Sequence, residues 1–176
     1  FSIMNAALGG VFSSRINLNL REKHGYTYGA HSIIDWRKSA GPFVVSTAVG
    51  TDVTADAARE VLAELERIRE EELTADELSL VINYLQGVFP IRYESTAAIA
   101  AALANLVTYD LPEDYYDTYR DRVGSVTPAD ALRAAREHIK PDSLQMVVVG
   151  DVTLSGNLEE MEFSLQVRAE RELNPK

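Results

Sequence analysis

The chain has 176 residues and a net charge of −10, from 17 Lys and Arg against 27 Asp and Glu, and 46% of its residues are hydrophobic. Its length and apolar content predict one globular domain with its own core, and its acidity argues against a nucleic-acid surface, which needs basic side chains. The absence of cysteine excludes disulfides, thiolate zinc sites and cysteine nucleophiles. No apolar run approaches the roughly 20 residues of a membrane helix. We therefore expect a soluble protein with no membrane contact, in the bacterial cytoplasm or periplasm.

The first third of the sequence predicts a helix followed by a β-hairpin. Residues 1–10 are apolar and small and end in a glycine pair. Ser13 is expected to cap a helix that ends near Gly25, a residue type common just after a helix C-terminus. Residues 26–36 are rich in Tyr, Thr and Ile, which favours a strand, and residues 43–49 favour a second strand after a turn.

The rest of the sequence predicts mostly helices. Residues 51–72, and the segment that follows a capping box at residues 74–77, carry apolar residues at helical spacing. The Ala-rich segment 95–109 is apolar nearly all round, which predicts a buried helix. Three shorter elements are expected next: a helix beginning at residues 111–112, a helix over residues 127–139 and a strand over residues 144–149.

This order of elements predicts an α+β fold, a two-layer sandwich of a mostly antiparallel sheet against a layer of helices. We expect a single domain over residues 5–155. Residues 156–176 contain five glutamates and form an acidic tail, which is interpreted as a last strand or a linker.

The three histidines are the first candidates for metal binding or acid–base chemistry. Their spacing in the sequence matches no recognised pattern for either. His24 and His31 lie seven residues apart across the expected helix–strand corner. Glu137-His138 matches the second half of a His-x-x-Glu-His zinc motif, but Ala134 takes the place of the first histidine. The sequence also lacks a Gly-x-Ser-x-Gly nucleophile turn and a phosphate-binding loop. We therefore expect no metal ligands and no cofactor in this chain, and ordinary surface or capping roles for the histidines.

The helix–strand corner offers a different kind of site. Arg21 falls on the last turn of the expected helix and Tyr28 falls early in the next strand, so a chain reversal at Gly25 lets both side chains point into one space. An Arg fork and a Tyr hydroxyl supply two hydrogen-bond donors suited to a carbonyl oxygen or a developing oxyanion. The alternative is structural, with Arg21 packed on the helix C-terminus and Tyr28 half-buried. Spacing alone leaves both interpretations open.

Two adjacent motifs in this region carry a resemblance to a known family. Residues 8–16 read Leu-Gly-Gly-Val-Phe-Ser-Ser-Arg-Ile, and residues 20–28 read Leu-Arg-Glu-Lys-His-Gly-Tyr-Thr-Tyr. Together they resemble the insulinase/pitrilysin family of zinc peptidases, which includes bacterial two-subunit peptidases and the mitochondrial processing peptidase. Ile16 in place of Leu, and Tyr26-Thr27 in place of Leu-Ala, are mild departures. The agreement continues in order at residues 41–43, 74–77, 126–130 and 146–151.

The resemblance implies one half of a clamshell peptidase that is built from two similar α+β halves. In this family one half carries the His-x-x-Glu-His zinc site, and the other supplies an Arg and a Tyr seven residues apart, a spacing that Arg21 and Tyr28 match. The chain is therefore expected to be the zinc-free half of a heterodimer or a two-half protein, inactive alone. It would hold an extended peptide for hydrolysis at a zinc in the partner half. The resemblance also implies that the first strands of the half-module precede Phe1.

Two other functions remain open at this level. The same fold resembles the core subunits of respiratory complexes, in which case the chain is a catalytically inert scaffold. A self-contained peptidase with an unusual site would require at least three metal ligands in this chain. Both halves of the family share the motif of residues 20–28, so the motif by itself does not decide which half this is.

Overall fold

The computed structural model describes residues 1–151, and the predicted acidic tail over residues 156–176 lies outside the described residues. In chain order the elements are α1 (Ser2–Asn5), a π-helical segment (Ala6–Gly10), α2 (Arg15–Asn17), a second π-helical segment (Leu18–Lys23), β1 (Ala30–Ile34), β2 (Phe43–Thr47), a 3-10 turn (Thr51–Val53), α3 (Thr54–Glu70), α4 (Ala75–Arg92), α5 (Thr96–Thr108), α6 (Tyr119–Gly124), α7 (Pro128–His138) and a second 3-10 turn (Pro141–Ser143). Within this described part, no helix is both long and apolar enough to cross a membrane.

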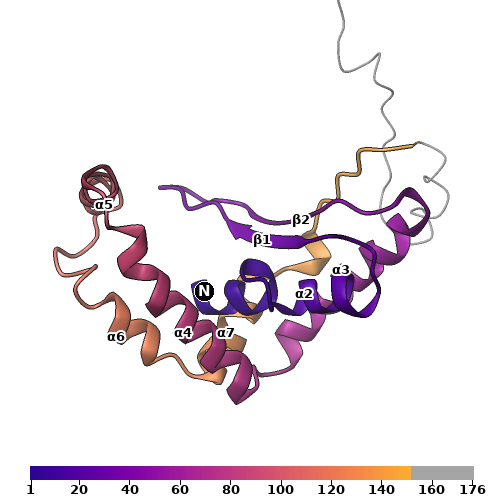
Figure 1. Cartoon of the computed structure of the whole chain (residues 1–176), viewed down its shortest axis with the longest axis horizontal. Coiled ribbons are helices and arrows are strands. Elements are labelled where there is room, and N and C mark those ends of the chain that lie inside the picture. The colour runs from indigo at the N-terminus through magenta and orange to yellow at the C-terminus, as the bar shows by residue number, and fades with distance from the viewer. Residues whose placement is uncertain (152–176) are drawn as a thin grey trace, which may run out of the picture.

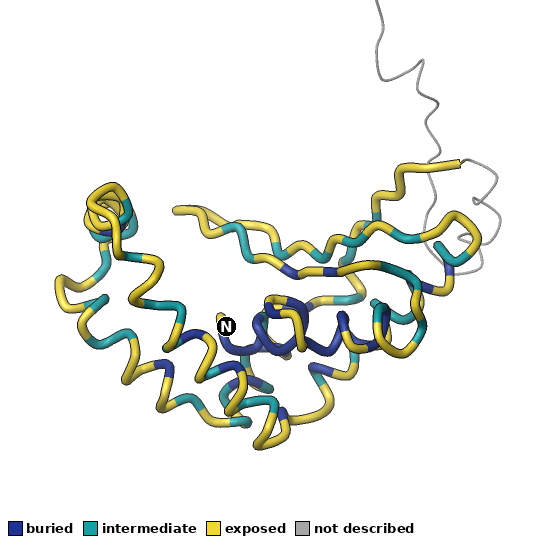
Figure 2. Tube along the Cα trace, viewed as in Figure 1, coloured by how far each residue is buried: buried dark blue, intermediate teal, exposed yellow. Residues whose placement is uncertain are grey.

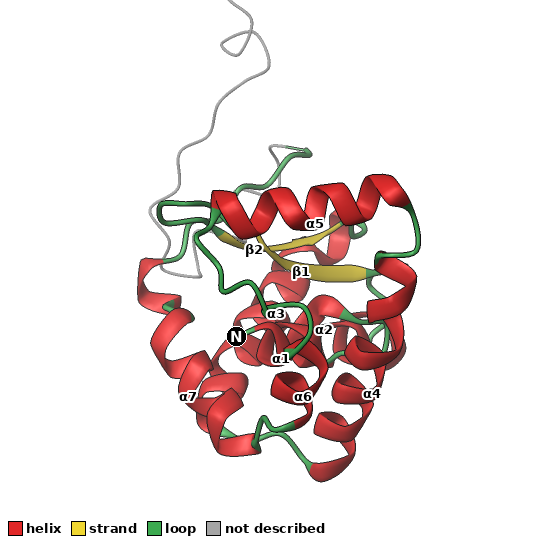
Figure 3. Ribbon diagram, turned by 90° about the vertical axis from the view of Figure 1, so that its left-hand side faces the viewer, coloured by secondary structure: helices red, strands yellow, loops and turns green. Residues whose placement is uncertain are grey.

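The helices and the hairpin form two layers, which confirms the predicted α+β fold (Figure 1). β1 and β2 pair antiparallel, with Ala30 opposite Thr47 and Ile34 opposite Phe43. Most helices lie on one side of the hairpin, whereas α5 stands apart from that layer (Figures 1 and 3). The hairpin therefore covers the helical layer on one side, and the corner that leads into β1 lies at the boundary between the two layers.

The core lies beneath β1, where the N-terminal helical segments meet the longer helices (Figure 2). Along β1 buried and exposed residues alternate, so Ala30 and Ser32 face the helices. Gly9 allows the first π-helical segment to pass close to β1, because a Cβ added there would lie 2.8 Å from the backbone nitrogen of Ser32. The largest fully buried apolar side chains are Met4, Leu8, Ile16, Leu20, Leu65, Ile68 and Val81.

The helix starts that the sequence predicted at residues 74 and 127 are confirmed. Thr74 accepts a hydrogen bond from the Glu77 backbone N–H, and the Glu77 carboxylate accepts one from the Thr74 N–H, which completes a capping box. Thr127 and Asp130 form the same arrangement at the start of α7. Local chemistry of this kind acts over three residues and is readable from sequence.

The first 25 residues depart from the prediction in two ways. Residues 1–10, for which no element was predicted, are helical from Ser2 to Gly10. The expected helix that ends at Gly25 is present, but Ser14, not Ser13, precedes it, and the Ser14 hydroxyl makes no cap bond to the backbone. That hydroxyl instead accepts a hydrogen bond from the side chain of Asn17, three residues further along the chain, so a bond between two side chains replaces the bond to the backbone.

Three predictions about the second half are wrong. Residues 144–149 pair with no strand in the described part of the chain, although their composition favours one. Residues 111–112 begin a turn, in which the Tyr115 N–H donates to the Pro112 carbonyl, and the next helix begins only at Tyr119. α5 is a helix as expected, but Ala102 is its one buried residue. Burial and strand pairing both depend on neighbours that a local pattern does not specify.

Candidate functional site

The helix–strand corner is built by a helix end, a left-handed glycine and a short loop. Arg21 lies in the π-helical segment Leu18–Lys23 that continues α2. Gly25 has a φ of 69°, a conformation that glycine adopts at little cost, and it turns the chain toward β1. The turn is closed by the Tyr26 N–H, which donates to the Leu20 carbonyl at 2.8 Å. The predicted reversal at Gly25 is therefore confirmed, and π-helical turns of this kind are often found at functional sites.

Arg21 lies at the surface and is held there by two neighbours. Its guanidinium carbon is 4.3 Å from the centre of the Phe12 ring, a cation–π contact. Its Nε lies 3.6 Å from Oε1 of Glu22. With one third of the side chain exposed, the remaining N–H groups of Arg21 can reach a ligand in front of the corner.

Tyr28 is fully exposed, with a relative accessibility of 101%, so the interpretation of a half-buried Tyr is wrong. Its backbone is nevertheless fixed, because Thr27 ties the loop to the end of β2. The Thr27 hydroxyl lies 2.7 Å from the Ala48 carbonyl and accepts the Gly29 N–H at 3.1 Å. Arg21 and Tyr28 thus share one corner, but within the described residues no contact between their side chains is present.

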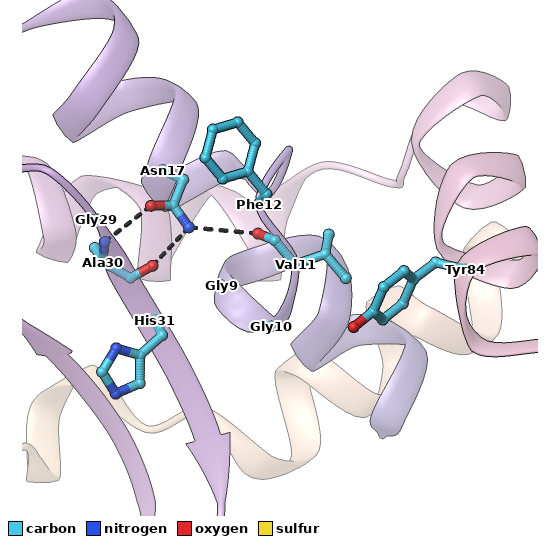
Figure 4. Close-up of a pocket in the computed structure, with 9 residues that line it drawn as sticks. All are labelled: Gly9, Gly10, Val11, Phe12, Asn17, Gly29, Ala30, His31 and Tyr84. Atoms are coloured by element: carbon cyan, nitrogen blue, oxygen red, sulfur yellow. Dashed lines mark hydrogen bonds between the residues drawn. The ribbon is translucent and has the colours of Figure 1, made fainter. Parts of the chain in front are cut away.

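An open hollow of about 490 Å³ adjoins this corner (Figure 4). Phe12 belongs both to the wall of the hollow and to the Arg21 contact, which makes the two features continuous. The hollow is lined by Gly9, Gly10, Val11, Phe12, Asn17, Gly29, Ala30, His31 and Tyr84. Sequence reasoning did not identify Asn17 or Tyr84, because neither belongs to a motif of titratable residues.

Below the corner, a half-buried ion pair anchors α2 to α4. Arg15 is buried, and its Nε and Nη2 donate to the two carboxylate oxygens of Glu77 at 2.7 and 3.0 Å. One turn further on, the Asn19 side chain donates to Glu64 of α3 at 2.8 Å. These contacts fix the helical segment that carries Arg21 against the long helices, so the surface above it has a rigid base.

The histidines lie in three separate places and do not fit a zinc site. His24 stacks on Tyr26 with ring centres 4.8 Å apart, and His31 is exposed on β1. His138 stacks on Phe1 at the other side of the molecule. In residues 1–151 no three His, Asp or Glu side chains are grouped so that they could hold a metal ion.

Comparison with known proteins gives the class of this protein: the chain belongs to the M16 family of zinc peptidases. Residues 1–85 match the family model of the peptidase M16 inactive domain. The description of the matched model is that of the inactive domain, the half expected from the resemblance. The family and fold implied by the two motifs are therefore confirmed.

Individual relatives show the same family. The chain is 30% identical over 135 residues to an uncharacterized zinc protease of Streptomyces coelicolor, covering 77% of this chain and 29% of that protein. It is 25% identical to the crystal structure of a peptidase M16 inactive domain from Pseudomonas fluorescens, with a TM-score of 0.75, covering 80% of this chain and 34% of that one. A protease from Helicobacter pylori shares the fold with a TM-score of 0.70 at 21% identity, over 79% of this chain and 33% of that one. The chain thus spans about a third of the length of these proteins.

Proposed function

We propose that this chain is the zinc-free half of an M16 peptidase and supplies Arg21 and Tyr28 to an active site shared with a zinc-binding half. The partner half would carry the zinc at which the peptide bond is cleaved. This chain would bind the extended peptide and place two hydrogen-bond donors beside the scissile carbonyl. The substrate sequence and the attachment of the two halves, on one chain or two, are outside the proposal.

The observation that carries the proposal is the exposure of two donors on a rigid corner. Tyr28 is fully exposed, so its side chain contributes nothing to the core, and its hydroxyl is available to a ligand. The loop that carries it is held in place by hydrogen bonds. Arg21 offers a charged fork on the same corner, held over Phe12. The backbone that carries each donor is fixed before a ligand binds. Donors fixed in place stabilise developing negative charge more strongly than mobile ones, because they do not reorganise during the reaction.

The test is reconstitution of the full-length protein with its zinc-binding half. This chain alone is expected to leave a peptide library uncleaved, and the assembled protein is expected to cleave it. Arg21→Ala and Tyr28→Phe should each lower kcat by about 100-fold or more without preventing assembly, because an oxyanion donor acts mainly in the transition state. Lys38→Ala, on the exposed turn between β1 and β2, is the control and should leave kcat unchanged. Full activity in the Arg21→Ala, Tyr28→Phe double variant would overturn the assigned roles.

A second candidate, an inert assembly subunit, is favoured by one observation, the uncovered apolar surface of α5. Leu103 and Val107 are 57% and 85% exposed there. The helix contains no charged residue, so the surface that it exposes is mainly apolar. A scaffold role predicts stable binding to other subunits and no peptide cleavage even with a zinc-binding half present. The same reconstitution therefore separates the two candidates.

A further inference from the structure

Asn17 connects the helix that carries Arg21 to the strand that follows Tyr28. Its side chain is buried, and it bonds both backbone groups of Ala30, the first residue of β1. The Asn17 Oδ1 accepts the Ala30 N–H at 2.8 Å, and the Asn17 Nδ2 donates to the Ala30 carbonyl at 2.6 Å (Figure 4). Nδ2 also lies 3.3 Å from the Val11 carbonyl, so one amide contacts three segments of the corner.

This pair of bonds takes the place of a neighbouring strand at the start of β1. A side-chain amide has the same donor and acceptor as a peptide group, so it can satisfy both backbone groups of one strand residue. Ala30 is thereby fixed although it begins the strand. Arg21 lies four residues after Asn17, about one helical turn, and Tyr28 lies two residues before Ala30. The amide therefore bonds the helix that carries Arg21 to the chain that follows Tyr28, whereas the Tyr26 N–H bonds the Leu20 carbonyl on the side that precedes Tyr28.

The other end of the Tyr28 segment is fixed by Thr27, through the Ala48 carbonyl and the Gly29 N–H. Tyr28 thus lies between two tethers, one to β2 through Thr27 and one to α2 through Asn17. The second tether reaches the element that carries Arg21, and the Tyr26 N–H bonds the same element at the Leu20 carbonyl. Because the Tyr26 bond lies before Tyr28 and the Asn17 bonds lie after it, Asn17 fixes the end of the Tyr28 segment that the Tyr26 bond leaves open.

We propose that Asn17 is a positioning residue that sets the place of Tyr28 relative to Arg21. The proposal rests on the proposed function for its catalytic consequence, but the geometric statement can be tested separately. The Asn17 amide is bonded to the backbone of Ala30, and Asn17 also lines the hollow beside the corner. Its loss acts through Tyr28: the Ala30 peptide loses both partners, the start of β1 loosens, and the hydroxyl of Tyr28 samples several positions.

Asn5 provides a matched control on the same strand. Its side chain also ties an N-terminal helix to β1, since the Asn5 Nδ2 donates to the Ser32 carbonyl at 3.3 Å and its Oδ1 accepts from the Ser32 hydroxyl at 2.8 Å. Ser32 lies two residues further into the strand than Ala30 and therefore further from Tyr28, and both residues are paired with β2. Asn5→Ala therefore removes a comparable helix–strand tie without releasing the loop that carries Tyr28.

The first experiment measures the position of Tyr28 directly, without reference to activity. The full chain carries 3-fluorotyrosine at position 28, and its fluorine NMR signal is recorded in the unaltered protein and in the Asn17→Ala and Asn5→Ala variants. We expect Asn17→Ala to shift and narrow the signal or to split it, and Asn5→Ala to leave it unchanged. Asn17→Ser, which keeps a small polar group too short to bond both atoms of Ala30, is measured alongside and should change the signal in the same direction. Equal signals in all of these proteins would overturn the proposal.

The second experiment uses the assembled peptidase. Asn17→Ala is expected to lower kcat by about tenfold or more with little change in KM, since displacement of a donor by a fraction of an ångström weakens transition-state binding. In a Tyr28→Phe background the same substitution should cost less than twofold, because the hydroxyl that it positions is already absent. Additive losses would show that Asn17 acts independently of the Tyr28 hydroxyl and would overturn its positioning role. If Tyr28→Phe alone leaves kcat unchanged, the proposed function fails, and the fluorine signal still decides whether Asn17 positions Tyr28.

Discussion

Glu77 joins two helices through a single carboxylate. Its oxygens accept hydrogen bonds from Arg15, and one of them also accepts the Thr74 N–H at 2.8 Å. Burial alone would raise the pKa of this carboxyl, but the hydrogen bonds from Arg15 and Thr74, together with the guanidinium charge, outweigh it and lower the pKa from 4.5 to about 2. Because the folded-state pKa is the lower one, the stabilisation is complete above pH 4.5 and is lost as the pH falls toward 2.

Glu77→Gln keeps the size of the side chain and removes its charge from Arg15. We expect the free energy of unfolding to fall by about 1–3 kcal/mol at neutral pH, with solvent access to the carboxylate favouring the lower end. The difference from the unaltered protein should shrink near pH 3, where the unaltered protein has itself lost part of the interaction. Chemical denaturation of both proteins at the two pH values measures this. Asp76→Asn, at the exposed neighbouring position, should change stability by less than about 0.5 kcal/mol. A pH-independent difference for Glu77→Gln would contradict the expectation.

At the scale of elements, the contact between the first π-helical segment and β1 depends on one missing methyl group. A Cβ at Gly9 would meet the Ser32 hydroxyl at 2.6 Å and the Ser32 backbone nitrogen at 2.8 Å. Gly9→Ala should therefore push β1 away from the helix and destabilise the fold by about 1–3 kcal/mol. Gly87→Ala in α4, where nothing lies within 4 Å of the added Cβ, should instead be neutral or stabilise by about 0.5–1 kcal/mol. Thermal unfolding of both variants tests this, and equal melting temperatures would refute it.

Elements whose signals are local were predictable from sequence, and elements defined by their neighbours were not. The caps at Thr74 and Thr127 and the reversal at Gly25 are matters of a few residues, and each was found where the pattern indicated. The strand over residues 144–149 was predicted from composition, but a strand also needs a partner, and the described residues supply none. The prediction that α5 is buried was wrong for the same reason, since an apolar helix is buried only when another surface covers it.

The candidate site divides in the same way. Arg21 and Tyr28 were predicted because their spacing around a reversal belongs to a motif; the structure gives their exposure, and their role in a site stays a prediction. Asn17 left no signal in the sequence, because a lone Asn in a helical stretch has many possible roles. Its role depends on Ala30, which is 13 residues away in sequence and in direct hydrogen-bond contact in the fold.

For the molecule as a whole, the main liability is apolar surface that the described residues do not cover. Val147 and Val149 are 86% and 96% exposed on an extended segment that has no strand partner in the described part of the chain. Unpaired extended segments with apolar side chains are sites of self-association, because they offer both backbone hydrogen bonds and apolar contact to another chain. We therefore expect the isolated chain to self-associate as its concentration rises, despite a net charge of −10.

Val149→Lys should shift this self-association to higher concentration, which light scattering over a concentration series measures. Gln145→Lys places the same charge on the same segment, where the residue replaced is exposed but polar. Both substitutions change the net charge equally, so a larger effect of Val149→Lys isolates the contribution of the apolar side chain from that of charge. Equal effects would mean that charge alone controls association. In that case the exposed valines would not be the contact surface, and another exposed apolar surface, such as that of α5, would be tested next.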